Sequence, residues 1–332
     1  MTSSKAKPSL GNRLILIVFV GLAVLTIGAF FLSRGWTGAG PSTKPIEVLV
    51  PPGSSLSRAA RTLETAGALA SADRFLALAK VYGSNDAIRA GEYEVPAGAS
   101  PSEVLRLLQS GRTLQRFVTV PEGTPSILVY ERLIAEPRLT GTVDVPDEGS
   151  VLPDSYSFQR GEARAAVLAR MQRAMRDELA KAWRARKPGI AVSSPREAVI
   201  LASVVEKETG VPAERRTVAG VYTNRLKQGI PLQADPTVIY PVTRGKPLGR
   251  RILRSELNAD NGYNTYAKAG LPAGPIANPG REALAAALDP APTRALYFVA
   301  KGDGGHVFAE TLAEHNANVQ RWYAIRRQRG EM

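Results

Sequence analysis

The feature that most constrains this chain is an uninterrupted apolar run near its start. Leu14–Leu32 spans nineteen residues without a charge, and Thr26 is its only polar side chain. At about 1.5 Å per residue, a helix over this run is roughly 28 Å long, close to the hydrocarbon thickness of a bilayer. A cleaved signal peptide usually has a shorter apolar region, of about 7–15 residues, before a small-residue cleavage site. The length therefore favours a membrane-spanning helix over a signal peptide.

Basic residues beside the run predict its orientation. Three precede it and one follows it closely: Lys5, Lys7, Arg13 and Arg34. Because short segments rich in Lys and Arg stay in the cytoplasm, residues 1–13 are predicted to be a cytoplasmic tail and residues 34–332 to lie outside. We therefore expect a single-pass protein of the cytoplasmic (inner) membrane, with its N-terminus inside.

Composition excludes several kinds of chemistry. The 332 residues include no Cys and only two His. Disulfides, cysteine nucleophiles, iron–sulfur clusters and thiolate zinc sites are therefore excluded, and neither a metal nor a cofactor is expected. The formal net charge of +13 favours polyanionic surroundings. Since most of that charge lies outside the cytoplasm in this topology, we expect an acidic envelope polymer as partner and no nucleic acid.

The remainder of the chain predicts an α+β class with two domains. Residues 33–45 are rich in small residues and Pro, which is typical of a linker. Residues 46–111 contain two strand–turn–helix patterns, with a capping box at Ser100–Glu103 and Gly111 after the helix. They predict a small α/β module. Residues 112–332 are longer and more helical, and predict a larger mixed α+β domain.

A helix predicted from Ser194 to Gly210 carries two glutamates near its end. Positions 198–205 are almost all apolar, so the helix should be buried on all sides. Glu206 follows beside small side chains, and desolvation there would raise its pKa and make it a candidate general acid. A surface carboxylate paired with a neighbouring Lys or Arg is the alternative. Glu208 points about 160° away, so the two glutamates cannot form one carboxylate pair.

A second helix is predicted over Ala213–Gln228, closed by Gly229. After it comes a stretch rich in Gly, Pro, Asn and Tyr, with QADPTVIY at 233–240 and YNTYAKAGLPAGPIANPG at 263–280, and loops of this composition often line clefts. Asp235 is a candidate second acid, a hydrogen-bond acceptor for substrate, or the former of an Asx-type turn before Pro. His306 and His315 lack metal-ligand spacing and are expected to be structural. Further residues offer hydrogen bonds and flat faces that suit a sugar polymer: Gln233, Tyr240, Tyr263, Asn264 and Tyr266.

Four segments resemble the endolytic murein transglycosylase (YceG-like) family. They are EGSVLPDSYSF at 148–158, LASVVEKETGVPAERRTVAGVYTNRLKQGIPLQADPTVIY at 201–240, YNTYAKAGLPAGPIANPG at 263–280 and LYFVAKGDGGHVF at 296–308. The resemblance covers essentially the whole chain, anchor included. Ala273 and Ser155 depart from the Pro and Thr that are common in the family, and the stretch 243–262 matches poorly.

The resemblance implies a membrane anchor at 14–32, a LysM-like glycan-binding module at 46–111 and a catalytic domain at 112–332. It identifies Glu206, the first Glu of EKET, as the catalytic residue. This residue would protonate the glycosidic oxygen between N-acetylmuramic acid and N-acetylglucosamine inside a nascent strand. Its carboxylate would then take the proton of the muramoyl C6 hydroxyl, which attacks C1 and leaves a 1,6-anhydro end. Such a cut would terminate strand elongation.

The same resemblance implies peptidoglycan strands as substrate and membrane peptidoglycan synthases as partners. The residues expected to bind sugar are Gln233, Asp235, Thr237, Tyr240, Tyr263, Asn264 and Tyr266. Two other functions stay open. One is a non-catalytic glycan-binding scaffold of the wall-synthesis machinery. The other is a muramidase-type hydrolase that uses Glu206 with Asp235, because hydrolases usually employ two carboxylates.

Overall fold

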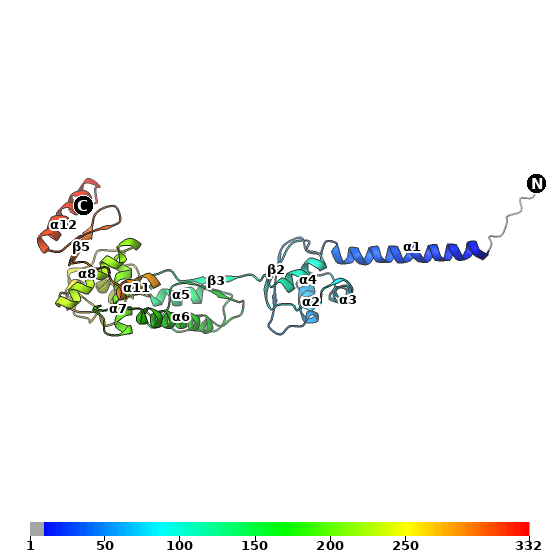
Figure 1. Cartoon of the computed structure of the whole chain (residues 1–332), viewed down its shortest axis with the longest axis horizontal. Helices are drawn as coiled ribbons and strands as arrows, with labels where there is room; N and C mark the ends of the chain where they lie inside the picture. The colour runs from blue at the N-terminus through cyan, green and yellow to red at the C-terminus, as the bar shows by residue number, and fades with distance from the viewer. Residues whose placement is uncertain (1–9, 332) are drawn as a thin grey trace, which may run out of the picture. The chain divides into compact units, whose positions relative to one another are not determined.

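The computed structural model describes the backbone of residues 10–331 and the side chains from residue 18 onward. The first nine residues of the predicted cytoplasmic tail, with Lys5 and Lys7, lie outside this part. The chain divides into two compact units, Met1–Arg116 and Phe117–Met332 (Figure 1). The mixed α+β class is confirmed. The domain boundary predicted after residue 111 lies a few residues before the end of the first unit.

Helix α1 (Leu10–Thr37) contains the predicted membrane-spanning run. Within its described side chains, the segment Val18–Thr37 is long and apolar enough to cross a membrane, and its large apolar side chains between Val18 and Leu32 are exposed. The helix continues beyond Leu32, so the start of the predicted linker is helical. Trp36 is buried, and its ring lies 6.1 Å from that of Phe75. The end of α1 therefore belongs to the core of the first unit.

The rest of the first unit has the order strand, helix, helix, strand, helix. Its elements are β1 (Ile46–Val50), α2 (Leu56–Thr65), α3 (Ala72–Tyr82), β2 (Gly91–Val95) and α4 (Pro101–Ser110). β1 and β2 pair antiparallel, from Ile46 opposite Val95 to Val50 opposite Gly91. The capping box at Ser100 and the left-handed Gly111 are present as predicted. Helix α3 is an element that the sequence patterns did not predict.

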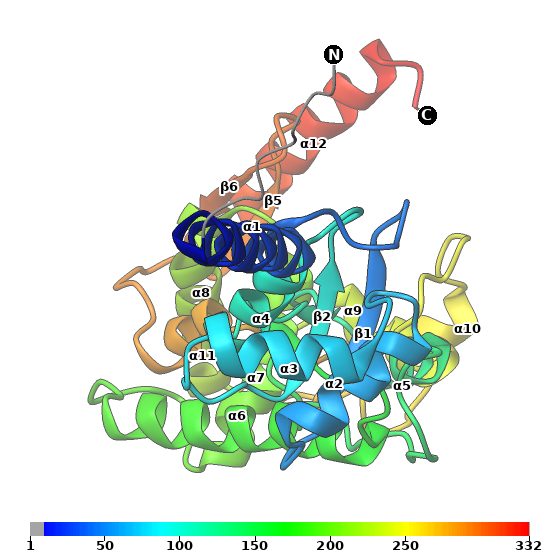
Figure 2. The same ribbon diagram turned by 90° about the vertical axis from the view of Figure 1, so that its right-hand side faces the viewer.

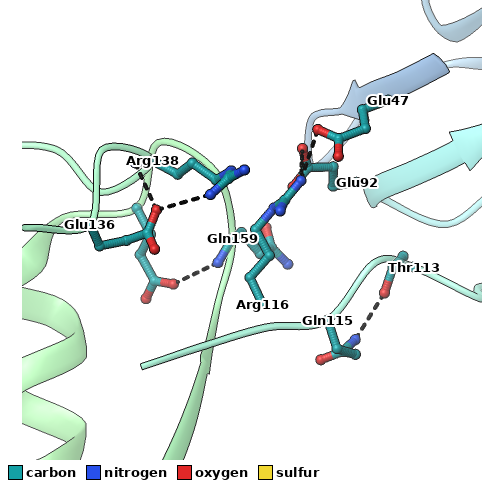
Figure 3. Close-up of polar contacts among 9 residues, drawn as sticks. Glu47, Glu92, Thr113, Gln115, Arg116, Glu136, Arg138 and Gln159 are labelled. Atoms are coloured by element: carbon teal, nitrogen blue, oxygen red, sulfur yellow. Dashed lines mark hydrogen bonds and ion pairs between the residues drawn. The ribbon is translucent and has the colours of Figure 1, made fainter. Parts of the chain in front are cut away.

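An ion-pair cluster fixes the segment that leaves this unit. Glu92, on β2, is 3% exposed, and its carboxylate accepts hydrogen bonds from Nε and Nη2 of Arg116 at 2.8 and 3.2 Å. Arg116 Nη2 also lies 2.8 Å from Glu47 Oε2, on β1. Figure 3 shows the guanidinium beside the two glutamates. Because a buried carboxylate is costly without a partner, Arg116 is held to the β1–β2 sheet.

The second unit surrounds a helical core. Its first element, β3 (Arg116–Thr119), begins at the last residue of the first unit. The others are α5 (Ser126–Ala135), β4 (Ser155–Phe158), α6 (Arg164–Arg184), α7 (Pro195–Glu208), η1 (Pro212–Glu214), α8 (Arg215–Gln228), α9 (Asp235–Thr243), α10 (Arg254–Leu257), α11 (Arg281–Leu288), β5 (Tyr297–Ala300), β6 (His306–Ala309) and α12 (Leu312–Gln328). β3 pairs with β4, and β5 pairs antiparallel with β6. Figure 2 shows α12 extending beside the β5–β6 hairpin.

Helix α7 is the centre of this core. All of residues 198–205 are buried, as the sequence predicted. Ser194 caps the helix by accepting a hydrogen bond from the Glu197 amide, and Pro195 occupies the first turn. Helices α6, α8 and α11 pack around α7 (Figure 1). Because α7 is buried on every side, the residues that follow its last apolar turn lie at the edge of the core.

The prediction of a loop over QADPTVIY is wrong, because most of this segment forms α9. Asp235 occupies the first turn, where a negative charge is favourable, and Pro236 follows in that turn. These are ordinary helix-start signals. The helix carries Tyr240 toward its C-terminal end, and it ends at the left-handed Arg244.

Candidate active site

Glu206 joins three segments at the end of α7. Its Oε1 lies 3.4 Å from Nη2 of Arg215, on α8, and its Oε2 accepts a hydrogen bond of 2.9 Å from the amide of Gly280. The same Arg215 nitrogen lies 3.5 Å from Glu122 Oε2. Gly280 is the N-cap of α11, and a Cβ there would collide with the Glu122 carboxylate. The Glu206 carboxyl group, 6% exposed, therefore has a partner for each oxygen.

Opposing effects act on the pKa of Glu206. Burial raises it above its usual range, and the nearby charge of Glu122 adds to this. The Gly280 amide and the Arg215 guanidinium lower it but do not cancel the effect of burial. The direction predicted from the sequence is therefore confirmed. The ion pair and the N-terminus of α11 nevertheless favour the carboxylate form.

Glu208 has different surroundings on the other side of α7. Its side chain is buried against Tyr222, which donates a hydrogen bond to it, and among the described residues its Oε2 has no partner. Burial, with the nearby charge of Asp235, raises the pKa of Glu208 to about 7. Sequence reasoning assigned no role to this residue. The sequence did indicate that Glu208 could be buried, because a helix that is buried on all sides can bury side chains on both of its faces near its end.

The loop residues predicted to bind sugar lie partly beside Glu208. Tyr266 donates a hydrogen bond of 2.6 Å to Oδ1 of Asp235, and Asp235 is exposed. Gln233 is exposed, has a φ of 53°, and accepts a hydrogen bond of 3.3 Å from Nη1 of Arg225. Charge interactions link Tyr266 and Arg225 to Glu208. One cluster therefore contains Glu208 and three of the predicted residues.

Thr237 and Asn264 are buried, and protein partners occupy their side chains. Thr237 Oγ1 donates to the carbonyl of Ala234 at 2.6 Å and lies 2.9 Å from the hydroxyl of Thr265. The Asn264 amide donates to the carbonyls of Glu256, Leu257 and Ala259. These contacts give both side chains a role in holding their loops. Direct sugar binding by either would require those loops to open.

Tyr240 and Tyr263 form a separate pair. Their rings lie 5.0 Å apart at 42° and line a groove of about 510 Å³. Glu148, in the same groove, is hydrogen-bonded to Tyr240. Its Oε1 also accepts from the Ser126 amide at 2.9 Å. Burial raises the pKa of Glu148. The structure thus separates the predicted residues into a glutamate cluster and an aromatic groove.

Asn278 ties the segments around these sites together. Its Nδ2 donates to the Thr124 carbonyl at 2.9 Å and to Ser126 Oγ at 3.0 Å. Its Oδ1 accepts from the amide of Val151 at 2.9 Å. The side chain is fully buried. It fixes the turn that carries Glu122 next to the loop that carries Glu148.

The histidines have protein partners. His306 Nδ1 lies 2.8 Å from Glu214 Oε2, and His315 stacks on Tyr297 at 5.2 Å. Burial lowers the pKa of His315. No group of three or more His, Cys, Asp or Glu side chains within the described part of the chain is arranged to hold a metal ion.

The fold and these clusters define a class of α+β proteins with an N-terminal apolar helix long enough to cross a membrane and with buried acid groups at the end of a central helix. Residues 48–321 match the sequence profile of the YceG-like family. The chain belongs to this family.

Similar proteins fit this assignment. A Bacillus subtilis (strain 168) protein named endolytic murein transglycosylase is 29% identical over 320 residues, which cover 87% of this chain and 88% of that protein. A Streptococcus pneumoniae (strain D39) protein of the same name is 28% identical over 358 residues, covering 90% of this chain and 63% of that protein. A crystal structure of a yceG-like protein from Listeria monocytogenes matches with a TM-score of 0.50 and 27% identity, over 83% of this chain and 99% of that one.

Proposed function

We propose that this protein is a membrane-anchored murein transglycosylase that cuts inside glycan strands without hydrolysis. The observation that carries the proposal is the buried carboxyl group of Glu208, whose pKa of about 7 lets it hold and release a proton near neutral pH. The names of the relatives supply the substrate, murein. Family membership extends over residues 48–321, which include both glutamates of α7.

One proton-carrying residue is enough for this reaction. The protonated carboxyl group donates to the glycosidic oxygen as the bond from C1 of N-acetylmuramic acid to that oxygen breaks. The C6 hydroxyl of the same sugar attacks C1, and the carboxylate takes the hydroxyl proton. The new end is a 1,6-anhydro ring, no water is consumed, and the residue regains its proton. A hydrolase would instead need a second carboxylate to activate water.

The contacts favour Glu208 over Glu206 as this residue. Glu206 is engaged by Arg215 and by the Gly280 amide, and both contacts stabilise its charged form. Glu208 has no cationic hydrogen-bond partner, and its Oε2 is unpaired. Asp235 and Tyr266 lie at the exposed edge of its cluster, so a strand that binds there would meet their side chains first. The sequence-based assignment to Glu206 remains a prediction that the same experiment tests.

The test uses purified murein, with the products identified by mass spectrometry in water enriched in ¹⁸O. The wild-type protein should produce 1,6-anhydro ends without ¹⁸O. Glu208→Gln keeps the shape but cannot cycle a proton, so activity should fall about 10²–10⁴-fold. Glu206→Gln should fold less stably, because Arg215 loses a partner, but should retain more activity.

If a folded Glu208→Gln protein cuts at the wild-type rate and the Glu206→Gln protein is inactive, the residue that transfers the proton is Glu206. Reducing ends that carry ¹⁸O would show a hydrolase, and Asp235 would then be the second carboxylate to study. Binding to murein without any cutting would favour the scaffold function.

The finer assignments belong to the same proposal. The helix α1 is a single-pass anchor with the N-terminus in the cytoplasm, and a reporter fused after Met332 should be active only outside it. The first unit binds glycan in a LysM-like manner, a role that its β1–α2–α3–β2 order supports. Cutting nascent strands beside membrane peptidoglycan synthases would end their elongation. Co-purification with such a synthase is the direct test of that partnership.

A further inference from the structure

The aromatic groove of the second unit contains groups that the proposed reaction does not use. It is lined by the loop 147–150, by the first turns of α7, by Tyr240 of α9, and by the segment around Tyr263 and Pro275. Its lining includes Asp147, Glu148, Ser150, Arg196, Tyr240 and Tyr263. The groove therefore combines two aromatic rings with both signs of charge.

Hydrogen bonds hold Tyr240, one of the two aromatic residues of the groove, in place. Glu148 hydrogen-bonds Tyr240, and the Ser126 amide and the Asn278 side chain both donate to its Oε1. These donors occupy the Glu148 carboxyl group. Glu148 therefore positions Tyr240, and a ligand would engage other groups of the groove.

Three polar groups in the groove are available to a ligand. Arg196 is exposed and makes one long hydrogen bond, of 3.3 Å from Nη2 to the carbonyl of Ala273. Asp147 is exposed, and within the described part of the chain its carboxylate has no hydrogen bond or ion pair. Ser150 Oγ is buried without a partner among these residues. A guanidinium and a carboxylate thus remain uncommitted in one groove.

We propose that this groove binds the peptide stem of murein, with a stem carboxylate on Arg196 and a stem amine on Asp147. This rests on the proposed function. The sugars of the strand offer these two side chains no charged partner once the lactyl group is amide-linked to the stem. The stem carries both carboxylates and an amine. Charge-assisted hydrogen bonds to both ends, over an aromatic surface, select such a zwitterionic ligand.

The consequence is substrate specificity. Strands that carry peptide stems are cut faster than strands stripped of them, because the groove adds binding that the sugars alone do not provide. The residues concerned are specificity determinants and lie outside the glutamate cluster.

The experiment uses the full chain in detergent and two measurements. Calorimetry measures binding of a free stem peptide, and kcat/KM is compared for strands with stems and for strands from which an amidase has removed them. Arg196→Gln and Asp147→Asn should each weaken peptide binding about tenfold, the effect of one charge-assisted hydrogen bond. Both should lower kcat/KM on stem-bearing strands only. Arg196→Lys keeps the charge but not the planar fork, so it should recover part of the binding.

Arg173→Gln is the matched control, because Arg173 is exposed on α6 and is not part of the groove. It should leave binding and the preference for stems unchanged. Equal cutting of both substrates, with peptide binding absent or insensitive to Arg196, overturns the groove proposal and leaves the proposed function intact. Peptide binding that depends on Arg196, without cutting of either strand, supports the groove and overturns the proposed function. An equal loss on both substrates in Arg196→Gln would make the groove a sugar subsite and overturn the peptide assignment.

Discussion

The two glutamates of EKET show how much the surroundings of a carboxyl group decide its chemistry. They are separated by one residue on one helix, and burial raises the pKa of both. Glu206 gains a guanidinium and a backbone amide from other segments, whereas Glu208 gains a tyrosine and a nearby negative charge. A charged partner favours ionisation, and a like charge opposes it. Burial therefore raises the pKa of Glu208 to about 7, whereas the Gly280 amide and the Arg215 guanidinium oppose the effect of burial on the pKa of Glu206.

This difference predicts how stability depends on pH. The pKa of Glu208 is about 7 in the folded state against an ordinary 4.5. Between these values the folded protein binds more protons than the unfolded chain, so the free energy of unfolding falls as pH rises and the loss is complete above about pH 7. At 1.36 kcal/mol per pKa unit, the complete loss is about 3 kcal/mol.

Glu208→Gln should remove this dependence. Urea denaturation at pH 5 and pH 8 should show a smaller decrease in stability for the variant than for the wild type. Glu282→Gln, at an exposed position of α11, is the control and should behave as the wild type. Equal decreases in all three proteins would show that folding does not raise the pKa of Glu208.

At the scale of elements, the site depends on a few side chains that bridge loops. Asn278 is the clearest, because it bonds two segments that are more than a hundred residues away in sequence. Replacement by Ala leaves the Val151 amide buried without its hydrogen bond. It also removes the side-chain bonds to Thr124 and Ser126, although the Thr124 carbonyl keeps the bond from the backbone amide of residue 278. An unpaired buried group costs about 1–3 kcal/mol, and the lost side-chain bonds add to this.

Asn278→Ala should therefore lower the free energy of unfolding by about 3 kcal/mol and reduce cutting, because the turn that carries Glu122 is released. Thermal and urea denaturation measure the first effect, and the murein assay measures the second. Asn316→Ala, on the exposed surface of α12, should change neither. If Asn278→Ala matched that control, the loop contacts would not contribute to the stability of the site.

At the scale of the whole molecule, α1 has an exposed apolar segment followed by a buried C-terminal end. Phe31 is 64% exposed on the apolar segment, whereas Trp36, one and a half turns later, is 8% exposed in the core of the first unit. Helix α1 therefore ends inside the core of the first unit. A large buried aromatic side chain is worth about 3–5 kcal/mol when truncated to Ala.

Trp36→Ala should destabilise the first unit by about that amount, and Phe31→Ala should not. Hydrogen exchange of the β1 and β2 amides, measured on the full chain in detergent micelles, reports this directly. Faster exchange in both variants would mean that the apolar segment itself supports the unit, and no change in either would mean that the Trp36 contact is dispensable.

Local sequence signals determined much of this protein. A run of nineteen uncharged residues with Thr26 as its only polar side chain favours an apolar environment, and eight consecutive buried positions place α7 in the core. Ser100, Ser194 and Gly229 mark helix ends through short-range hydrogen bonds or backbone conformation, which neighbouring residues alone decide. The same is true of the strand–turn–helix patterns. Helix α9 escaped prediction although its start signals are also local.

Tertiary structure decided the surroundings of each acid group and which polar residues line a groove. Arg215, Gly280 and Glu122 are distant from Glu206 in sequence or separated from it by a turn, and only folding brings them to its carboxyl group. Folding likewise buries Thr237 and Asn264 and leaves Arg196 and Asp147 exposed in one groove. The pKa and the accessibility of a side chain depend on charges and desolvation from all segments around it. Sequence periodicity predicts only the face of a helix or strand on which a residue lies.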